Sequence, residues 1–318
     1  PPFMLSLRTV VAAIDFSPGA AVALVRAADL AHRTGAALHL LHADVLFHAS
    51  GHGAPPAVVP ASTLRVRVER FAMETLGLRD AGGLDRLGPT VAVVRDVSVP
   101  GAVLRYLAAV DPDLLVVGTH GRSGLSRALL GSVAEALVAS APCPVLTVPE
   151  RGAVAGPGPD APVLVGVDFS ERSRSALVAG RVLAEATGAS VEVVHVVRDA
   201  GPYPGLAPHI LSLVDFDPEQ GAAVRERLER FAATVCSPAA LHVGLGAPGR
   251  LVAALASERG AGAVVLGTHG RTGLARLIGS VSEAVIRRAP CPVLTLQEAA
   301  SLRVSARPVA AAAPSLPL

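Results

Sequence analysis

The sequence repeats itself, and this repetition constrains the fold more than any other feature. The segment GTHGRSGL at 118–125 recurs as GTHGRTGL at 267–274, and APCPVLT at 141–147 recurs unchanged at 289–295. Two shorter blocks also recur in the same order, namely IDFS at 14–17 with VDFS at 167–170 and LHA at 41–43 with VHV at 194–196. Because repeated blocks in a fixed order mark repeated structural units, the chain is predicted to contain a duplicated domain.

The domain boundaries follow from the repeat and from local composition. A chain of 318 residues has room for two domains of roughly 100 to 150 residues each. We assign residues 1–149 to the first domain and 162–298 to the second, because residues 150–161 are rich in proline and glycine, as linkers commonly are. Residues 299–318 show no amphipathic period, so this tail is expected to be disordered.

The composition argues against several classes of protein. The 28 basic residues, all of them arginine, are interspersed with 26 acidic ones, so nucleic acid is not predicted as a partner. No run of roughly 20 apolar residues is present, so a membrane is not predicted as a partner either. The three cysteines, Cys143, Cys236 and Cys291, form no CxxC pattern, which favours free thiols in the reducing cytoplasm.

Short apolar runs alternate with longer segments of helical period in each copy. Continuous apolar runs are typical of strands that are covered on both faces. In the first copy, strands are predicted at 9–14, 37–41, 91–94, 114–117 and 145–148, and helices at 18–34, 62–76, 101–109 and 133–140. This order predicts an α/β fold with two tandem, doubly wound, five-stranded parallel-sheet domains. Ser17 is expected to cap the first helix and Gly35 to end it.

A glycine-rich loop follows the fourth predicted strand, at the end of the sheet where such folds bind ligands. It contains Gly118 and Gly121 and, after nine further residues, Gly131 and Ser132. Glycine lets backbone amides approach a phosphate closely, and Ser132 with Glu135 forms a capping-box pattern that would start a helix there. The loop is therefore a candidate phosphate cradle, and it is not a Walker A loop because the chain contains no lysine. The alternative is that the glycines only form a tight turn and Ser132 only caps a helix.

Asp15 and Ala43 follow the first and second predicted strands, at the same edge of the sheet. The carboxylate of Asp15 could accept hydrogen bonds from a ribose or an exocyclic amine, and the backbone near Ala43 could contact an adenine edge. The alternative for Asp15 is an Asx turn or a helix cap beside Phe16 and Ser17.

The histidines and cysteines carry weaker signals. His42 and His195 end apolar strands, where packed and hydrogen-bonded histidines are expected. For His120 and His269, which lie inside the glycine loops, phosphate contact and loop packing are equal alternatives. No metal site is predicted, because His48 and His52 lie in a glycine- and proline-rich loop without metal-ligand partners at a convincing spacing. The Cys-Pro pairs are expected to orient the last strand of each domain, and no catalytic residue is predicted.

Together these residues resemble the universal stress protein family. The resemblance lies in the Asp-Phe-Ser ending of the first strand, the Leu-His pair, the Gly-2x-Gly-9x-Gly-Ser signature and the Ala-Pro-Cys-Pro-Val-Leu ending, and it covers nearly the whole chain as two copies. It implies Rossmann-like domains of strand order 3-2-1-4-5 that bind ATP, with any Mg²⁺ carried by the nucleotide. The residues that it implies for the first site are Asp15, Ala43, Gly118, Gly121, Gly131, Ser132 and Val133. Those that it implies for the second site are Asp168, Val196, Gly267, Gly270, Gly279, Ser280 and Val281.

The second copy departs from this signature by one residue. Eight residues separate Gly270 from Gly279, whereas nine separate Gly121 from Gly131. One missing residue in an extended segment displaces an amide by up to about 3.5 Å, more than a hydrogen bond tolerates. We therefore expect nucleotide occupancy to favour the first copy. The alternative is a compensated shift, because the second copy has one residue more between Pro248 and its glycine loop than the first has at the matching place.

The fifth strand of each domain is predicted to form a sheet edge, and edges must be covered or paired. We expect the fifth strands, 145–148 and 293–296, to pair about a pseudo-twofold axis, so that the chain forms an intramolecular pseudo-dimer. Further homodimerisation is left open.

The sequence therefore predicts a cytoplasmic, ATP-binding stress-response protein that acts through conformation or through unknown protein partners. No residue is placed as a water-activating base beside the phosphates, so turnover is not indicated. Two alternatives stay open. One is a slow ATPase or adenylate-handling enzyme on the same fold, and the other is a nucleotide-free interaction module whose glycines are structural.

Overall fold

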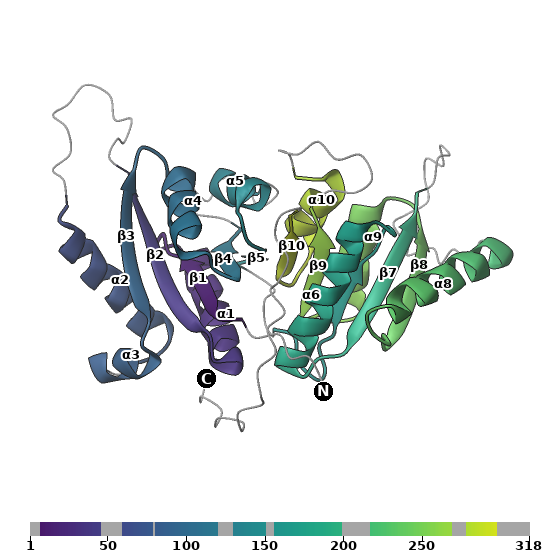
Figure 1. Cartoon of the computed structure of the whole chain (residues 1–318), viewed down its shortest axis with the longest axis horizontal. Coiled ribbons are helices and arrows are strands. Elements are labelled where there is room, and N and C mark those ends of the chain that lie inside the picture. Colours follow the sequence, from purple (N-terminus) through teal and green to yellow (C-terminus); the bar gives the residue numbers. More distant parts are fainter. Residues whose placement is uncertain are drawn as a thin grey trace. The chain divides into compact units, whose positions relative to one another are not determined.

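The computed structural model describes residues 7–45, 59–78, 80–119, 130–150, 156–198, 217–268 and 278–297. The chain divides into two compact units, with the boundary after Glu150 (Figure 1). Within the described ranges, no helix has the length and apolar character that crossing a membrane would require.

The first unit is built on five parallel strands. These are β1 (Thr9–Ala13), β2 (Ala37–Val45), β3 (Thr90–Asp96), β4 (Leu114–Gly118) and β5 (Val145–Val148). β1 pairs with β2 on one side and with β4 on the other, while β2 also pairs with β3 and β4 with β5. The strands of this unit therefore lie in the order β3-β2-β1-β4-β5. The connections reverse direction between β1 and β4, which is where a doubly wound sheet opens a crevice for a ligand.

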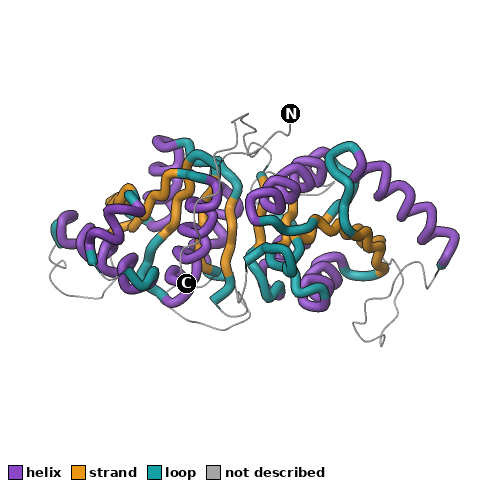
Figure 2. Tube along the Cα trace, turned by 90° about the horizontal axis from the view of Figure 1, so that it is seen from below, coloured by secondary structure: helices purple, strands orange, loops and turns teal. Residues whose placement is uncertain are grey.

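Helices cover both faces of this sheet (Figures 1 and 2). They are α1 (Pro18–Thr34), α2 (Ala61–Thr75), α3 (Ala81–Leu87), α4 (Val99–Val110) and α5 (Ser132–Ser140). α1 begins and ends as predicted, because the side chain of Ser17 accepts the N–H of Ala20 at 3.1 Å and Gly35 ends the helix at a φ of 68°. Coverage on both faces explains the continuous apolar strands, whose residues Val10, Val11 and Val116 are fully buried.

The second unit repeats this architecture. Its strands are β6 (Val163–Gly166), β7 (Val191–Val197), β8 (Ala240–Leu245), β9 (Ala263–Gly267) and β10 (Val293–Leu296), and its helices are α6 (Glu171–Thr187), α8 (Pro218–Ala233), α9 (Pro248–Glu258) and α10 (Ser280–Arg288). β6 pairs with β7 and β9, β7 also pairs with β8, and β9 pairs with β10, all in parallel. The direction of the connections therefore reverses between β6 and β9.

One helix of the first unit was not predicted from the sequence. α3 is formed by AGGLDRL, which is only seven residues long and has two glycines, so it shows no clear helical period. Local caps stabilise it instead: the carboxylate of Asp80 accepts the N–H of Gly83 at 2.9 Å, and Gly88 ends the helix at a φ of 58°. The strands and the other helices of this unit were predicted in their observed order.

Part of the interval predicted as a linker packs onto the second unit. The backbone N–H groups of Gly158 and Ala161 each donate to the other residue's carbonyl at 3.1 Å, which closes a small turn. Pro157 lies directly against Gly262, where an added Cβ would approach the Pro157 Cα to 2.3 Å. These contacts place residues 157–161 against the turn between α9 and β9.

Candidate functional site

The candidate site of the first unit lies at the carboxyl edge of β1 and β4, where the connections reverse. Asp15 follows β1 closely, and Gly118 is the last residue of β4. The loop that leaves β4 is closed by a backbone hydrogen bond, in which the N–H of Gly131 donates to the carbonyl of Thr119 at 2.9 Å. This bond brings the start of α5 back to the end of β4, so Gly118, Gly131 and Ser132 meet at one edge of the sheet. Val133 follows in the first turn of α5.

The prediction that Ser132 caps α5 is wrong. Gly131 is the N-cap, with an extended backbone, and its carbonyl accepts the N–H of Glu135 at 2.9 Å. Ser132 is already helical, makes no capping hydrogen bond and has an exposed side chain. The loop-closing bond of Gly131 fixes the helix start one residue earlier than the capping-box pattern indicated. The hydroxyl of Ser132 is therefore exposed at the first turn of α5 and does not cap the backbone of the helix.

The second unit has the same helix start. Gly279 is the N-cap of α10, and Ser280 is the first helical residue, again exposed and without a capping bond. The hydroxyl of Ser282 donates to the carbonyl of Gly267 at 2.9 Å, which ties the first turn of α10 to the end of β9. Val281 lies between these two serines in the same turn.

Gly118 has a packing reason to be glycine. An added Cβ would lie 2.8 Å from the carbonyl carbon of Gly19, so the first turn of α1 packs directly on the end of β4. At Gly267 of the second unit, the same Cβ would lie 3.2 Å from the Cβ of Arg172 on α6. These two glycines therefore serve helix–strand packing, which is the structural alternative raised for them. Gly121, Gly270, His120 and His269 lie outside the described residues.

Asp15 forms the Asx-type turn that was the alternative to ligand binding. Its Oδ1 accepts the backbone N–H of Ser17 at 3.0 Å and the Ser17 hydroxyl at 2.6 Å. Asp168 repeats this arrangement with Ser170 at 3.0 and 2.5 Å. One carboxylate oxygen in each unit is thus committed to holding the strand-to-helix turn.

Sequence reasoning did not single out Phe16, the residue inside this turn. Its φ is 65°, in the left-handed region that side chains other than glycine rarely adopt. The ring lies 4.7 Å from the ring of His42 and 5.6 Å from that of Phe71, and the guanidinium of Arg67 lies 4.8 Å above its centre. The Asp-Phe-Ser segment, which was matched in both copies, was the signal that could have pointed to this conformation.

Phe169 of the second unit has the same environment. Its φ is 66°, and its ring lies 4.4 Å from His195 and 5.7 Å from Phe231, with Arg227 at 4.2 Å above the ring. Both copies therefore have a strained backbone at this phenylalanine, next to the candidate site. The contacts of the phenylalanine ring hold the strained conformation in place.

His42 and His195 are packed, hydrogen-bonded residues, as predicted. The Nδ1 of His42 donates to the carbonyl of Ile14 at 2.8 Å, and that of His195 donates to the carbonyl of Val167 at 2.7 Å. Each bond joins the second strand of its unit to the residue that precedes the aspartate. Each histidine therefore holds the Asp-Phe-Ser turn of its unit through this hydrogen bond and through its contact with the phenylalanine ring.

The expectation that Ala43 follows its strand is wrong. β2 continues to Val45, and Ala43 pairs with Val94 of β3. Val196 lies within β7 in the same way and pairs with Gly244 of β8. The second strand of each unit is longer than its apolar run because it continues beside the third strand after the first strand has ended.

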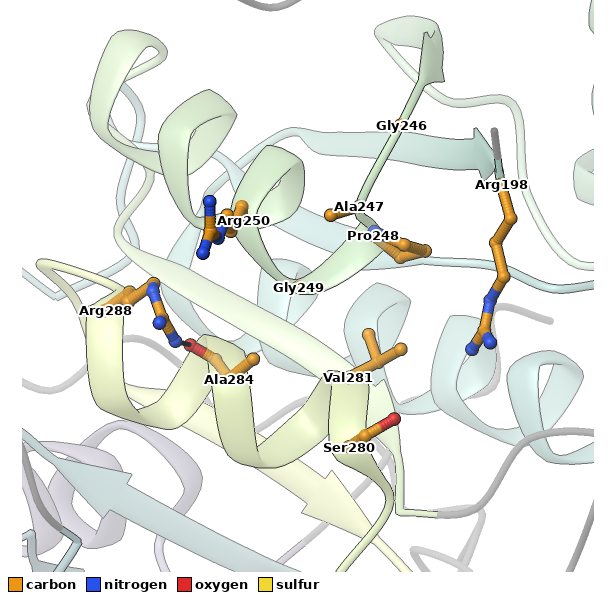
Figure 3. A pocket seen from close by; sticks show the side chains of 10 residues that line it. All are labelled: Arg198, Gly246, Ala247, Pro248, Gly249, Arg250, Ser280, Val281, Ala284 and Arg288. Carbon is orange, nitrogen blue, oxygen red and sulfur yellow. Dashed lines mark hydrogen bonds between the residues drawn. The ribbon is translucent and has the colours of Figure 1, made fainter. Parts of the chain in front are cut away.

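The second unit contains a cavity of about 410 Å³ beyond the carboxyl ends of its strands. Its walls come from the end of β7, the turn between β8 and α9, the first turn of α9 and the length of α10 (Figure 3). Two of the predicted site residues, Ser280 and Val281, line it, whereas Asp168 and Val196 do not. Cavities of roughly 300 to 1,000 Å³ hold small-molecule ligands in proteins.

The shorter loop of the second unit does not displace the start of its helix. The N–H of Gly279 donates to the carbonyl of Thr268 at 2.7 Å, which is the same closing bond that joins Gly131 to Thr119. The missing residue is therefore absorbed between Thr268 and Gly279. The shift of up to about 3.5 Å expected from sequence does not reach the helix start.

The extra residue of the second copy does not compensate for the short loop. Fifteen residues separate the N-cap of α4, Ser98, from the start of β4 at Leu114, and fifteen separate the N-cap of α9, Ala247, from the start of β9 at Ala263. The extra residue counted from the prolines therefore reflects their positions in the helices, because Pro100 is the second residue of α4 and Pro248 is the first residue of α9. The hypothesis of a compensated shift is wrong for this reason.

The buried thiols take no part in this site. Burial raises the pKa of Cys143 and of Cys291 to about 12, so both remain protonated at neutral pH. Among the described residues, no group of three histidine, cysteine or acidic side chains is arranged to hold a metal ion.

Two parallel-sheet units, each with a loop-closed helix start at the edge where its connections reverse, define an α/β protein with two tandem domains. The chain belongs to the universal stress protein family, whose sequence pattern matches residues 6–149 and again 161–297. The described strands and helices of both units fall within the matched segments.

Comparison with individual proteins agrees with this assignment. Universal stress protein Rv2623 of Mycobacterium tuberculosis is 31% identical over 303 residues, which is 91% of this chain and 96% of the relative. Universal stress protein Rv2005c of the same species is 36% identical over 196 residues, 59% of this chain, but the match spans only 63% of that relative's length. The crystal structure of a putative universal stress protein from Pseudomonas aeruginosa has the same fold, with a TM-score of 0.63 at 21% identity over 92% of this chain and 94% of its own.

Nucleotide complexes have been solved for two smaller proteins of this kind. One is a universal stress protein with cAMP, with 25% identity and a TM-score of 0.32 over 45% of this chain and 97% of its own. The other is the universal stress protein of Archaeoglobus fulgidus with dAMP, with 24% identity and a TM-score of 0.30 over 42% of this chain and 96% of its own.

Proposed function

We propose that this protein binds an adenine nucleotide, specifically ATP, at the carboxyl edge of each unit. It acts in the stress response by binding, through a change of conformation that protein partners detect. The phosphates contact the first turns of α5 and α10, where Ser132 and Ser280 are exposed, and the base and ribose lie toward Asp15 or Asp168. Any Mg²⁺ arrives with the nucleotide.

The observation that carries this proposal is the helix start that both units share. In each unit, a backbone bond of 2.7 to 2.9 Å returns the chain to the edge of the sheet and begins a helix at a glycine. The first amides of a helix have no partners within the helix and carry a partial positive charge, so they favour an anion. The exposed serine adds a hydroxyl beside them. The cavity in the second unit, which Ser280 and Val281 line, is large enough for such a ligand.

We further propose that the domains span 1–149 and 162–298, that each has the strand order 3-2-1-4-5, and that a pseudo-twofold axis relates them. The common order of elements and the parallel registers within each unit support the repeated strand order. A cytoplasmic location is supported by the three cysteines, all of which are free thiols.

The test is a double variant, Ser132→Asp with Ser280→Asp, in the full chain. A carboxylate in the first turn of a helix stabilises the helix by about 0.3 to 1 kcal/mol, but it repels a phosphate at the same place. The variant should keep or slightly raise its melting temperature without ligand, and it should lose most of the rise that millimolar ATP gives the wild type. Thermal unfolding with and without ATP measures both effects.

The matched control is Ser190→Asp, which changes an exposed serine to aspartate just before β7, at the amino edge of the sheet. This control should respond to ATP as the wild type does. A double variant that keeps the full ATP response, or a wild type that shows none, would contradict the proposal.

A further inference from the structure

The cavity of the second unit is lined by three arginines that come from different elements. Arg198 directly follows β7, Arg250 lies in the first turn of α9, and Arg288 ends α10. Figure 3 shows Arg198 at the end of the cavity near Ser280 and Val281, and Arg250 with Arg288 at the other end. A positive side chain is thus present at each end of the cavity.

No negative side chain balances these charges within the cavity. Among the described residues that line it, none is aspartate or glutamate. Within the same described part of the chain, neither Arg198, Arg250 nor Arg288 forms an ion pair. Arg288 donates one N–H to the carbonyl of Ala284 on its own helix at 3.2 Å, which leaves most of its donors available. Because arginine is always charged and forms paired hydrogen bonds with phosphate, such a lining selects an anion.

A close packing of two helices shapes this cavity. An added Cβ on Gly249 would lie 2.5 Å from the Cβ of Ala284, so only glycine lets the first turn of α9 approach α10 this closely. The turn before it contains Gly246 at a φ of 132°, a conformation that side chains rarely adopt. The approach of α9 to α10 sets Arg250 and Arg288 on the same side of the cavity.

The first unit lacks all three charges. The matched segments place Val45 where the second unit has Arg198 and Ser140 where it has Arg288. Gly101, the third residue of α4, stands where the second unit has Arg250, the third residue of α9. Apart from these positions, the surrounding segments remain similar, as GSVAEALVAS at 131–140 and GSVSEAVIRR at 279–288 show. At these matched positions, the second unit therefore has three arginines where the first unit has uncharged residues.

We infer that the second unit selects a polyphosphate chain, such as the triphosphate of a nucleotide, whereas the first unit does not discriminate by phosphate number. The inference rests on the proposed function, because it names the charge class that the second nucleotide site prefers. It reverses the order expected from loop length, since the arginines strengthen binding in the copy with the shorter loop. The chain then responds to the ratio of triphosphate to monophosphate through one of its two units.

Calorimetric titration of the full chain with ATP, AMP and inorganic tripolyphosphate tests this inference. Each of Arg198→Gln, Arg250→Gln and Arg288→Gln should weaken the tighter class of ATP sites by about tenfold, the effect of one hydrogen bond between charged groups. Each should change AMP affinity less than about twofold, since a monophosphate cannot reach both ends of the cavity. Added salt should weaken ATP binding more than AMP binding. The control is Arg230→Gln on α8, which removes the same charge from an exposed side chain and should change nothing.

The outcomes separate this inference from the proposed function. If ATP binds but the three variants keep the wild-type ratio of ATP to AMP affinity, the inference is overturned while the function stands. If tripolyphosphate binds in an arginine-dependent way but no nucleotide does, the polyphosphate preference stands and the nucleotide function fails. If neither binds, both fail. The reciprocal variant, Val45→Arg with Ser140→Arg, changes two positions that are not buried and should raise the preference of the first unit for ATP over AMP. An unchanged preference would count against the inference.

Discussion

At the scale of single residues, the strand-to-helix turn shows how one position can serve several needs. Phe16 adopts a left-handed backbone conformation, which costs a residue with a side chain roughly 1 to 2 kcal/mol. The conformation allows Asp15 to accept two hydrogen bonds from Ser17 while Ser17 caps α1. The ring contacts with His42, Phe71 and the guanidinium above it offset the strain.

We predict that Phe16→Ala and Phe16→Gly both destabilise the protein, and that the glycine variant is the more stable by about 1 kcal/mol. Both variants lose the ring contacts, but only glycine relieves the backbone strain. Urea unfolding of the two variants measures this difference directly.

Phe71, the partner of Phe16 in an edge-on ring contact, provides the control because it lies within α2. Phe71→Gly should be less stable than Phe71→Ala by about 1 kcal/mol, since a helix interior disfavours glycine. If the glycine variant were less stable than the alanine variant at both Phe16 and Phe71, the strain argument would be contradicted.

At the scale of elements, the second unit contains a buried carboxylate that joins three of them. Glu192 of β7, only 4% exposed, accepts a hydrogen bond from the Nε2 of His242 on β8 at 2.8 Å and from Arg259, just after α9, at 2.9 Å. In the first unit, the corresponding strand position holds His39, which contacts the hydroxyl of Tyr106 at 2.9 Å. The two copies thus fill the same place with an ionic cluster and with a neutral pair.

The cluster has a defined dependence on pH. Burial by itself raises the pKa of Glu192, but hydrogen bonds from Arg259 and His242 together outweigh it, so the pKa lies below its ordinary value. The folded state then binds fewer protons than the unfolded state, and the carboxylate stabilises the fold above the unfolded pKa. This stabilisation is lost as the pH falls through the folded pKa.

We predict that Glu192→Gln lowers the free energy of unfolding at pH 7 by roughly 1.5 to 3 kcal/mol, the range for a hydrogen bond to a charged group. The difference between wild type and variant should shrink as the pH falls below the unfolded pKa and through the lowered folded pKa, because the wild-type carboxyl becomes protonated there. Urea unfolding across this pH range measures the effect. Glu226→Gln, which breaks an exposed pair with Arg230, should cost less than about 1 kcal/mol. A Glu192→Gln difference that does not vary with pH would refute the assignment.

At the scale of the whole molecule, duplication has preserved the framework while individual positions have diverged. Each unit keeps five parallel strands, a glycine-started helix after the fourth strand and the strained turn after the first. The units differ in α3, in the ionic cluster at Glu192 and in the arginines of the cavity. The shared framework is therefore a scaffold on which the two sites acquired different charge.

Residues 157–161 contact the second unit ahead of its proposed start at residue 162, and the contribution of this contact to stability can be tested with fragments. We predict that residues 156–298 unfold cooperatively and more stably than residues 162–298, by about 1 to 2 kcal/mol for the two lost hydrogen bonds. These bonds join Gly158 and Ala161, and the longer fragment also keeps Pro157 against Gly262. Circular dichroism during urea unfolding measures both fragments. Equal midpoints would show that the segment before 162 contributes nothing.

The sequence by itself determined the duplication, the α/β class and nearly every strand and helix of the first copy. These features depend on period and local chemistry: apolar runs, the Ser17 cap and the Gly35 stop are properties of neighbouring residues. The presence of both Gly118 and Ser132 at one edge also followed from the rule for parallel sheets.

Only the tertiary structure decided where the predicted site residues lie. The backbone bond between Gly131 and Thr119 moved the cap of α5 from Ser132 to the glycine, and β3 extended β2 beyond Ala43. The close approach of α9 to α10 at Gly249 then brought Arg250 and Arg288 into one cavity with Arg198. These outcomes depend on contacts between segments far apart in the chain, which period and composition do not record.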